Sequence, residues 1–195
     1  FSLAKQISGN DPIILAELAL TLEQAGKPET AMEIAAEATE AAPEDISVAI
    51  FFAKMCLSRG FATRAVATLE QAIHSDPNNA EAWLLLSTAA NNSGVLPVPL
   101  QYAQKSIQLN KNEASPYTTL ATAHRMNGNL DESLAAYDQA LAIDEKSNEA
   151  IAGKTEVLIS LGDIEEAELL LQNVTASDSV LLTLATVRLA RIANN

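Results

Sequence analysis

The stretch that decides the fold is ASPYTTLATAHRMNGNLDESLAAYDQALAIDEKS, residues 114–147, because its pattern recurs along the chain. It contains one of five glycines that follow each other at intervals of 34 residues, namely Gly26, Gly60, Gly94, Gly128 and Gly162. A fixed period of this length indicates an array of structural repeats. We number each 34-residue unit so that its glycine is at position 15.

Each unit predicts two helices. Positions 4, 7, 8 and 11 hold mostly apolar or small residues at the three-and-four spacing of one helix face, and positions 20, 24 and 27 repeat this pattern. Residues 114–147 place Tyr117 and Leu120 on the first helix and Tyr137 and Ala140 on the second. Glycine at position 15 is expected to end the first helix in a left-handed conformation. Each unit is therefore predicted to be a helix–turn–helix whose buried face needs its neighbours.

Helix starts can also be predicted. Two first helices are expected to begin with a cap followed by proline, at Asp11-Pro12 and at Ser115-Pro116. Two second helices carry pairs with capping-box spacing, Asn129 with Glu132 and Asp163 with Glu166.

The unit resembles the tetratricopeptide repeat, on the residues Tyr117, Leu120, Gly128, Tyr137 and Ala140. The resemblance covers residues 12 to about 177. It implies an all-α fold, a right-handed superhelical α-solenoid of antiparallel helix pairs. It also implies that the first helices line a concave groove.

The period predicts the organisation of the chain. The expected segments are a remnant second helix of a truncated repeat at 1–11, repeats at 12–45, 46–79, 80–113, 114–147 and 148–177, and a capping helix at 178–195. The first segment suggests a fragment of a longer array, because Phe1, Ala4 and Ile7 fit the end of a repeat. The third repeat is irregular, since Pro97 and Pro99 predict a shifted helix start rather than a break. The fifth repeat is expected to be shortened.

Composition excludes several classes of protein. The 195 residues include 35 Ala and 26 Leu, which fits the small and large packing positions of such a repeat. The formal net charge of −13 argues against a nucleic-acid partner. A single Cys excludes a disulfide framework. Residues 82–104 form the longest charge-free run, but Pro97 and Pro99 prevent an uninterrupted membrane span.

No group of residues predicts catalysis, a cofactor or a metal site. Cys56 falls on a buried helix face, and a reactive thiol needs exposure and a positive neighbour. His74 and His124 lack a second ligand at metal spacing, and His124 is expected to form a hydrogen bond between helices. Glu29, Glu33, Glu37 and Glu40 form an acidic stripe, which we interpret as a solvated outer face in preference to a dock for a basic partner. The chain is predicted not to be an enzyme.

The resemblance places positions 2, 5, 9, 12 and 13 in the concave groove. The predicted binding residues are those at positions 5, 9, 12 and 13 of the second to fourth repeats: Ile50, Lys54, Leu57, Ser58, Leu84, Thr88, Asn91, Asn92, Thr118, Thr122, Arg125 and Met126. The groove is apolar toward the N-terminal side and polar in the middle. The carboxylate clamp of chaperone-binding relatives is disfavoured, because its positions hold Lys54 but no Asn.

The sequence thus predicts a non-catalytic scaffold that binds a peptide or helix of an unidentified protein, with no nucleic acid and no membrane insertion in this segment. One alternative is a recruiting or regulatory arm of a larger enzyme such as a transferase. Another is an array that self-associates weakly. A cytoplasmic location is slightly favoured over a periplasmic or membrane-anchored one that a removed leader would imply.

Overall fold

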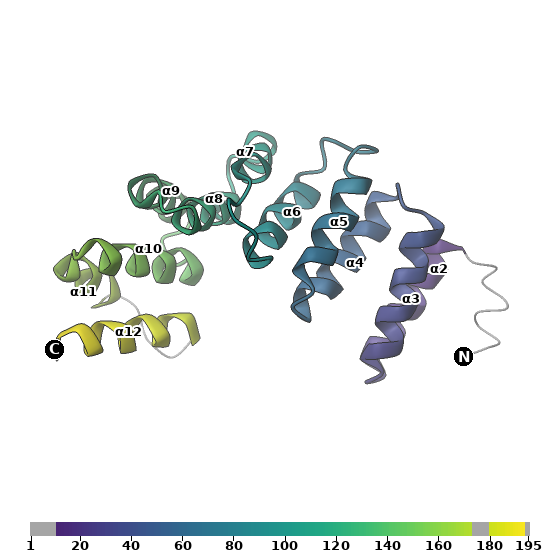
Figure 1. Cartoon of the computed structure of the whole chain (residues 1–195), viewed down its shortest axis with the longest axis horizontal. Helices are drawn as coiled ribbons and strands as arrows, with labels where there is room; N and C mark the ends of the chain where they lie inside the picture. The colour runs from purple at the N-terminus through teal and green to yellow at the C-terminus, as the bar shows by residue number, and fades with distance from the viewer. Residues whose placement is uncertain (1–10, 173–179, 194–195) are drawn as a thin grey trace. The chain divides into compact units, whose positions relative to one another are not determined.

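The computed structural model describes residues 11–172 and 180–193, and within these ranges the regular structure is entirely helical (Figure 1). The chain divides into two compact units, residues 1–94 and 95–195. The first unit contains α2 (Pro12–Gln24), α3 (Pro28–Ala41), α4 (Ile46–Ser58), α5 (Ala62–Ala72) and α6 (Ala80–Asn92). Its helices pack as successive pairs, α2 with α3 and α4 with α5, and each first helix also contacts the next one, α2 with α4 and α4 with α6.

The second unit repeats this arrangement. It contains α7 (Leu100–Leu109), α8 (Ala114–Met126), α9 (Leu130–Ile143), α10 (Asn148–Leu161), α11 (Ile164–Gln172) and α12 (Val180–Ala193). Helix α8 packs against α9 and α10, and α10 packs in turn against α11 and α12. The prediction of an all-α fold built of consecutive helix pairs is confirmed.

The five periodic glycines all have a left-handed backbone, with φ between 71° and 90°. A Cβ added at any of them would meet nothing within 4 Å. Glycine is therefore required at these positions for its backbone conformation and not for lack of space. At Gly60, the reversal lets the Phe61 amide donate to the Cys56 carbonyl at 2.8 Å, which satisfies one of the last carbonyls of α4. The prediction that these glycines end the first helices is confirmed.

Small residues let the paired helices approach closely. Alanines at positions 8, 20 and 27 are completely buried, as Ala53, Ala65 and Ala72 show for one pair. At position 20 of the fourth repeat, where serine replaces alanine, the Ser133 hydroxyl donates to the Ala121 carbonyl at 2.7 Å. The excess of alanine is therefore a packing requirement.

The predicted caps are only partly present. Asp11 accepts from the amides of Ile13 and Ile14, with Pro12 at the first helical position, as expected. The prediction for Ser115 is wrong, because α8 begins one residue earlier at Ala114 and its cap position is Glu113. The capping box at Asn129 is also wrong, since that side chain makes no cap hydrogen bond. A polar residue at the right spacing does not by itself adopt the side-chain rotamer that a cap hydrogen bond requires.

The third repeat has the expected late start of its second helix. Helix α7 begins at Leu100, whereas the period counted from Ala62 in α5 would begin it at residue 96. The Asn127 side chain fixes the segment just before α7. It accepts from the Val98 amide at 2.7 Å and donates to the Val98 carbonyl at 2.9 Å. Val98 itself is buried.

Parts of the predicted organisation fall outside the described residues, namely almost all of the remnant helix at 1–11 and the end of the fifth repeat at 173–177. Helix α12 lies within the segment predicted to cap the array. Its Leu189 packs in one buried cluster with Leu158 of α10 and Ala167 of α11.

Candidate functional site

In each unit, side chains of successive first helices meet on a common face, which we call the first-helix face. In the first unit, Arg59 Nη2 contacts Glu23 Oε1 at 2.9 Å and so joins α4 to α2. Lys54 Nζ contacts Glu81 Oε1 at 2.6 Å and joins α4 to α6. Each cation on this part of the face is therefore matched by a carboxylate.

Apolar side chains lie among these ion pairs. Ile13 and Leu20 of α2 are 59% and 45% exposed, a large fraction for such residues. Ile50 and Leu57 of α4 and Leu84 of α6 are half-buried. The first-helix face of this unit thus offers apolar surface on which charge is locally compensated.

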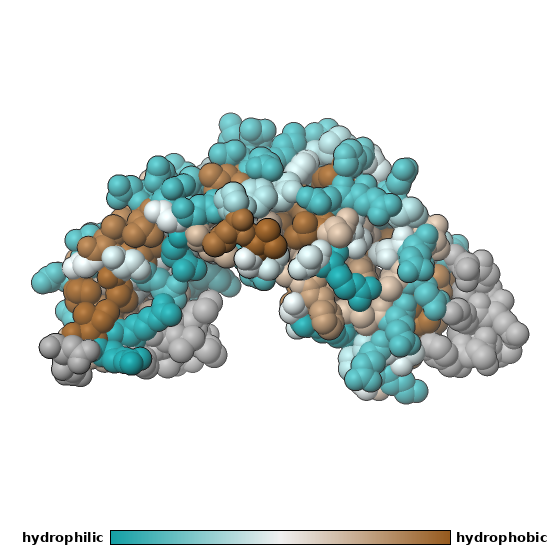
Figure 2. Space-filling view, in the orientation of Figure 1, coloured by the Kyte–Doolittle hydropathy of each residue, from teal (hydrophilic) through white to brown (hydrophobic). Residues whose placement is uncertain are grey.

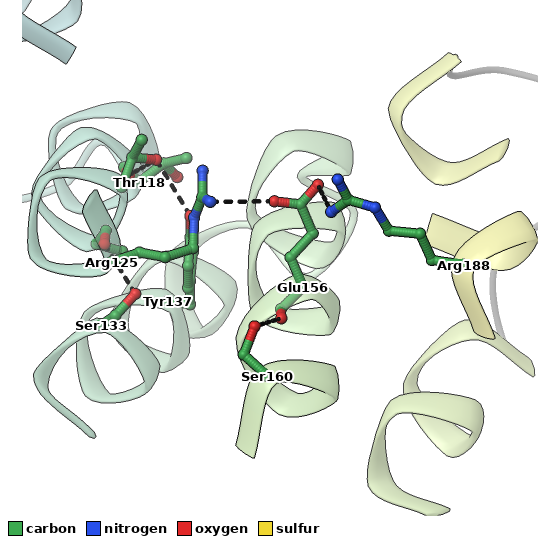
Figure 3. Close-up of polar contacts among 9 residues, drawn as sticks. Thr118, Arg125, Ser133, Tyr137, Glu156, Ser160 and Arg188 are labelled. Atoms are coloured by element: carbon green, nitrogen blue, oxygen red, sulfur yellow. Dashed lines mark hydrogen bonds and ion pairs between the residues drawn. The ribbon is translucent and has the colours of Figure 1, made fainter. Parts of the chain in front are cut away.

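The first-helix face of the second unit is more polar (Figure 3). Glu156 of α10 contacts two arginines, with Oε2 at 3.3 Å from Arg125 Nη1 and Oε1 at 3.1 Å from Arg188 Nη1. This single carboxylate therefore connects α8, α10 and α12. The hydroxyls of Thr122 and Tyr137 lie 3.1 Å apart beside it.

Tyr137 also shows how closely the helices approach in this region. Its ring is buried, and a Cβ built on Gly153 of α10 would lie only 2.2 Å from its hydroxyl oxygen. The ring can lie in this place only because position 6 of the fifth repeat has no side chain.

The structure distributes the predicted binding residues over three first helices. Helix α4 carries Ile50, Lys54, Leu57 and Ser58, α6 carries Leu84, Thr88, Asn91 and Asn92, and α8 carries Thr118, Thr122, Arg125 and Met126. Lys54, Ser58 and Asn92 are exposed, and Asn91 is buried at 7% exposure. The first two groups belong to the first unit and the third to the second unit.

The predicted binding set omits the partners that fix these side chains, although Glu81 and Glu156 occupy positions 2 and 9, which the resemblance places in the groove. Glu81, Glu156 and Arg188 make the contacts that orient Lys54 and Arg125. A search of the sequence for opposite charges roughly one period apart could have found these pairs, because such residues lie on adjacent first helices.

The other candidates for chemistry are part of the packing. Cys56 is buried, and this burial raises the pKa of its thiol, although the charges of Arg64 and Arg59 oppose the shift. The expected hydrogen bond of His124 is absent: its Nδ1 is buried and no partner is found for it among the described residues. Within residues 11–172 and 180–193, no three His, Cys, Asp or Glu side chains are grouped as a metal site would require.

Comparison with known proteins gives the family. Two tetratricopeptide repeat models match the chain, one over residues 57–111 and one over residues 124–180. The chain belongs to the tetratricopeptide repeat (TPR) family. No curated protein sequence matches it significantly.

Solved TPR structures match almost the whole chain. A TPR protein of Parabacteroides merdae superposes with a TM-score of 0.80 at 15% identity, over 94% of this chain and 72% of that one. A thermophilic TPR protein of Thermus thermophilus gives 0.69 at 18% identity, over 94% and 100% of the two chains. YrrB, described as a TPR protein with an unusual peptide-binding site, gives 0.68 at 18% identity, over 95% and 96%. These likenesses confirm the predicted α-solenoid fold.

TPR proteins bind protein or peptide partners and are typically non-catalytic scaffolds, so membership of the family supports an interaction role for this chain. None of the helices in the described ranges is long and apolar enough to cross a membrane.

Proposed function

We propose that this TPR chain is a non-catalytic scaffold that holds a peptide or a helix of a partner protein on its first-helix face. The observation that supports this most is the series of contacts between adjacent first helices, Lys54 with Glu81 in one unit and Arg125 with Glu156 in the other. Residues of successive repeats are thereby adjacent on one surface, as a binding face requires.

Each unit's first-helix face offers surface to a bound segment, and this surface is apolar in the first unit and polar in the second. Ile13 and Leu20 offer exposed apolar surface in the first unit. Thr122 and the two arginines of Glu156 offer hydrogen-bonding groups in the second unit. Peptide recognition commonly combines apolar anchors with a few oriented polar groups.

The test is capture of partners from a native lysate by the immobilised chain, compared with a variant carrying Lys54→Glu, Leu57→Asp, Leu84→Asp and Arg125→Glu. These four changes should abolish capture of the proteins that the wild type retains, because they place charge on apolar contacts and reverse both cations. A matched control carries Lys27→Glu, Phe61→Asp, Lys111→Glu and Ile143→Asp, all at exposed positions away from this face.

Circular dichroism of both variants establishes that the helices are retained. If the first variant still captures the same partners as the control, the binding surface lies elsewhere on the molecule and the proposal is wrong.

A further inference from the structure

Position 4 of the repeat is filled by an aromatic ring in two places, and each ring makes the same hydrogen bond. The Trp83 Nε1–H donates to the Pro77 carbonyl at 2.9 Å. The Tyr117 hydroxyl donates to the Lys111 carbonyl at 3.4 Å. Pro77 and Lys111 both occupy position 32 of the preceding repeat, so the ring bridges the end of one repeat and the start of the next.

At two positions 4 that are not aromatic, Ala49 and Ile151, the structure has a cleft. Ala49 lies in a cleft of about 350 Å³ in the first unit, and Ile151 lies in one of about 570 Å³ in the second unit. Both clefts are lined by the same three positions of the repeat, 32, 4 and 23, which are Pro43, Ala49 and Thr68 in one and Glu145, Ile151 and Leu170 in the other. The two clefts are therefore the space that a ring fills in the neighbouring repeats.

The Ile151 cleft has the more suitable walls for a ring. Besides Ile151 and Leu170 it is lined by Leu169, which is 61% exposed, whereas polar side chains line most of the Ala49 cleft. Figure 2 shows apolar surface in this region, over α10 and α11. Its volume lies within the range of roughly 300–1,000 Å³ that is usual for ligand sites.

Lys154 lines one wall of the cleft, and its ammonium group is already bound to carboxylates of this chain. Its ammonium is held by Asp138 Oδ1 at 2.8 Å and by Glu166 Oε1 at 3.3 Å, so its aliphatic stem is fixed along one wall. A fixed stem offers apolar contact, and its charge favours the face of an aromatic ring.

We propose that the Ile151 cleft binds a tryptophan side chain of a partner protein, with the indole N–H donating to the Glu145 carbonyl. The chain itself provides the precedent, since Trp83 makes the equivalent hydrogen bond to the Pro77 carbonyl of the preceding repeat. Tryptophan is favoured over tyrosine because the Trp83 hydrogen bond is the shorter of the two. The cleft uses other repeat positions than the first-helix face, so this inference is independent of the proposed function.

The test uses N-acetyl-L-tryptophanamide as the probe in a titration of the ¹⁵N-labelled full chain, followed by amide chemical shifts. Saturable shifts are expected at residues 145–154 and 166–170. N-acetyl-L-phenylalaninamide, which lacks the indole donor, should bind several-fold more weakly. Leu169→Glu should weaken binding of the tryptophan probe at least fivefold, and Phe61→Glu, at an exposed apolar residue of the other unit, should leave it unchanged.

Two further variants make the result decisive. Ile151→Trp should fill the cleft from within and abolish the probe-induced shifts at residues 145–154. Trp83→Ala should open a third cleft, lower the melting temperature and be partly rescued by the probe. If the probe rescues Trp83→Ala but causes no saturable shifts around Ile151 in the wild type, or if Leu169→Glu leaves those shifts unchanged, the proposal is overturned.

Discussion

The absence of a side chain at Gly153 allows two helices of the second unit, α9 and α10, to pack closely. Gly153 of α10 lies against the buried Tyr137 ring of α9, and a Cβ at this position would be 2.3 Å from Tyr137 Cζ. The usual gain of about 1 kcal/mol for alanine over glycine in a helix is thus opposed by a clash with a ring that has no free space. At this contact the steric effect decides the outcome.

Gly153→Ala should therefore lower the free energy of unfolding by about 1–3 kcal/mol, as overpacked cores do. The sign should reverse once the ring is removed: on a Tyr137→Ala background, Gly153→Ala should be neutral or stabilising by up to about 1 kcal/mol. Urea denaturation of the four proteins of this cycle measures both effects. Equal destabilisation on the two backgrounds would contradict the role of the ring.

The surroundings of Lys154 lead to a prediction about the dependence of stability on pH. Burial by itself would lower the pKa of Lys154, but the hydrogen bonds and charges of Asp138 and Glu166 outweigh this and raise it. A raised folded pKa means that the ion pairs contribute stability fully below the unfolded value of about 10.4 and lose it as the pH rises through the folded pKa.

Replacing Lys154 by leucine, the residue at position 7 in three other repeats, should remove this alkaline loss. The free energy of unfolding of Lys154→Leu should fall less than that of the wild type as the pH rises above about 10.4, where the wild type loses the contribution of these ion pairs. At neutral pH the variant should be at least as stable, because exposed carboxylates tolerate the loss of a partner and the leucine is well placed to pack. A parallel fall for both proteins would show that Lys154 is not the titrating group.

At the scale of helices, the connection between α6 and α7 is the part of the fold that departs most from the period. Its geometry depends on the Asn127 amide, which makes two hydrogen bonds to the backbone of Val98. The change that should expose this dependence is Asn127→Asp, because the carboxylate keeps the acceptor but loses the donor and faces the Val98 carbonyl.

Asn127→Asp should cost about 1–3 kcal/mol of stability, the usual effect of an unsatisfied polar group that is partly buried. Chemical denaturation gives the loss, and hydrogen exchange at Val98 should accelerate more than exchange in α9. The control is Asn129→Asp, an exposed residue in the same loop whose side chain makes no cap hydrogen bond. A similar effect of both changes would mean that the loss is one of charge rather than of these two bonds.

The helices could be predicted from the sequence, because the residue pattern that marks them recurs in every repeat. Individual local contacts could not be predicted in this way. Five equally spaced glycines and the alanines at positions 8, 20 and 27 determine helix pairs, because backbone conformation and close approach leave few alternatives. The caps at Ser115 and Asn129 were predicted wrongly, since a cap depends on one rotamer and one turn. The face was predictable as a set of positions, and the period could have suggested which opposite charges pair, but the contact of Glu156 with both Arg125 and Arg188 depends on how the helices pack.

At the scale of the whole molecule, the net charge of −13 should control stability. The described ion pairs are few and mostly exposed, and such pairs contribute little. The exposed face of α3 with Glu29, Glu33 and Glu40 adds like charges on one helix (Figure 2). Repulsion should therefore outweigh attraction at low ionic strength.

Raising NaCl from about 0.01 M to about 0.3 M shortens the screening length from roughly 30 Å to below 10 Å. The melting temperature should rise by about 2–4 °C, the shift that 1 kcal/mol causes in a chain of this size. Glu33→Lys combined with Glu40→Lys should give a similar rise at low salt and a smaller one at high salt. A fall of the melting temperature with added salt would show that the ion pairs dominate instead.

The placement of the aromatic residues makes the two units separately observable. Trp83 is the one tryptophan of the chain and lies in the first unit, while all three tyrosines, Tyr102, Tyr117 and Tyr137, lie in the second. Indole emission excited at long wavelength therefore reports the unfolding of one unit, and tyrosine absorbance reports chiefly that of the other. Coincident midpoints in a denaturant series would mean that the whole array melts cooperatively, and distinct midpoints would give the stability of each unit without cutting the chain.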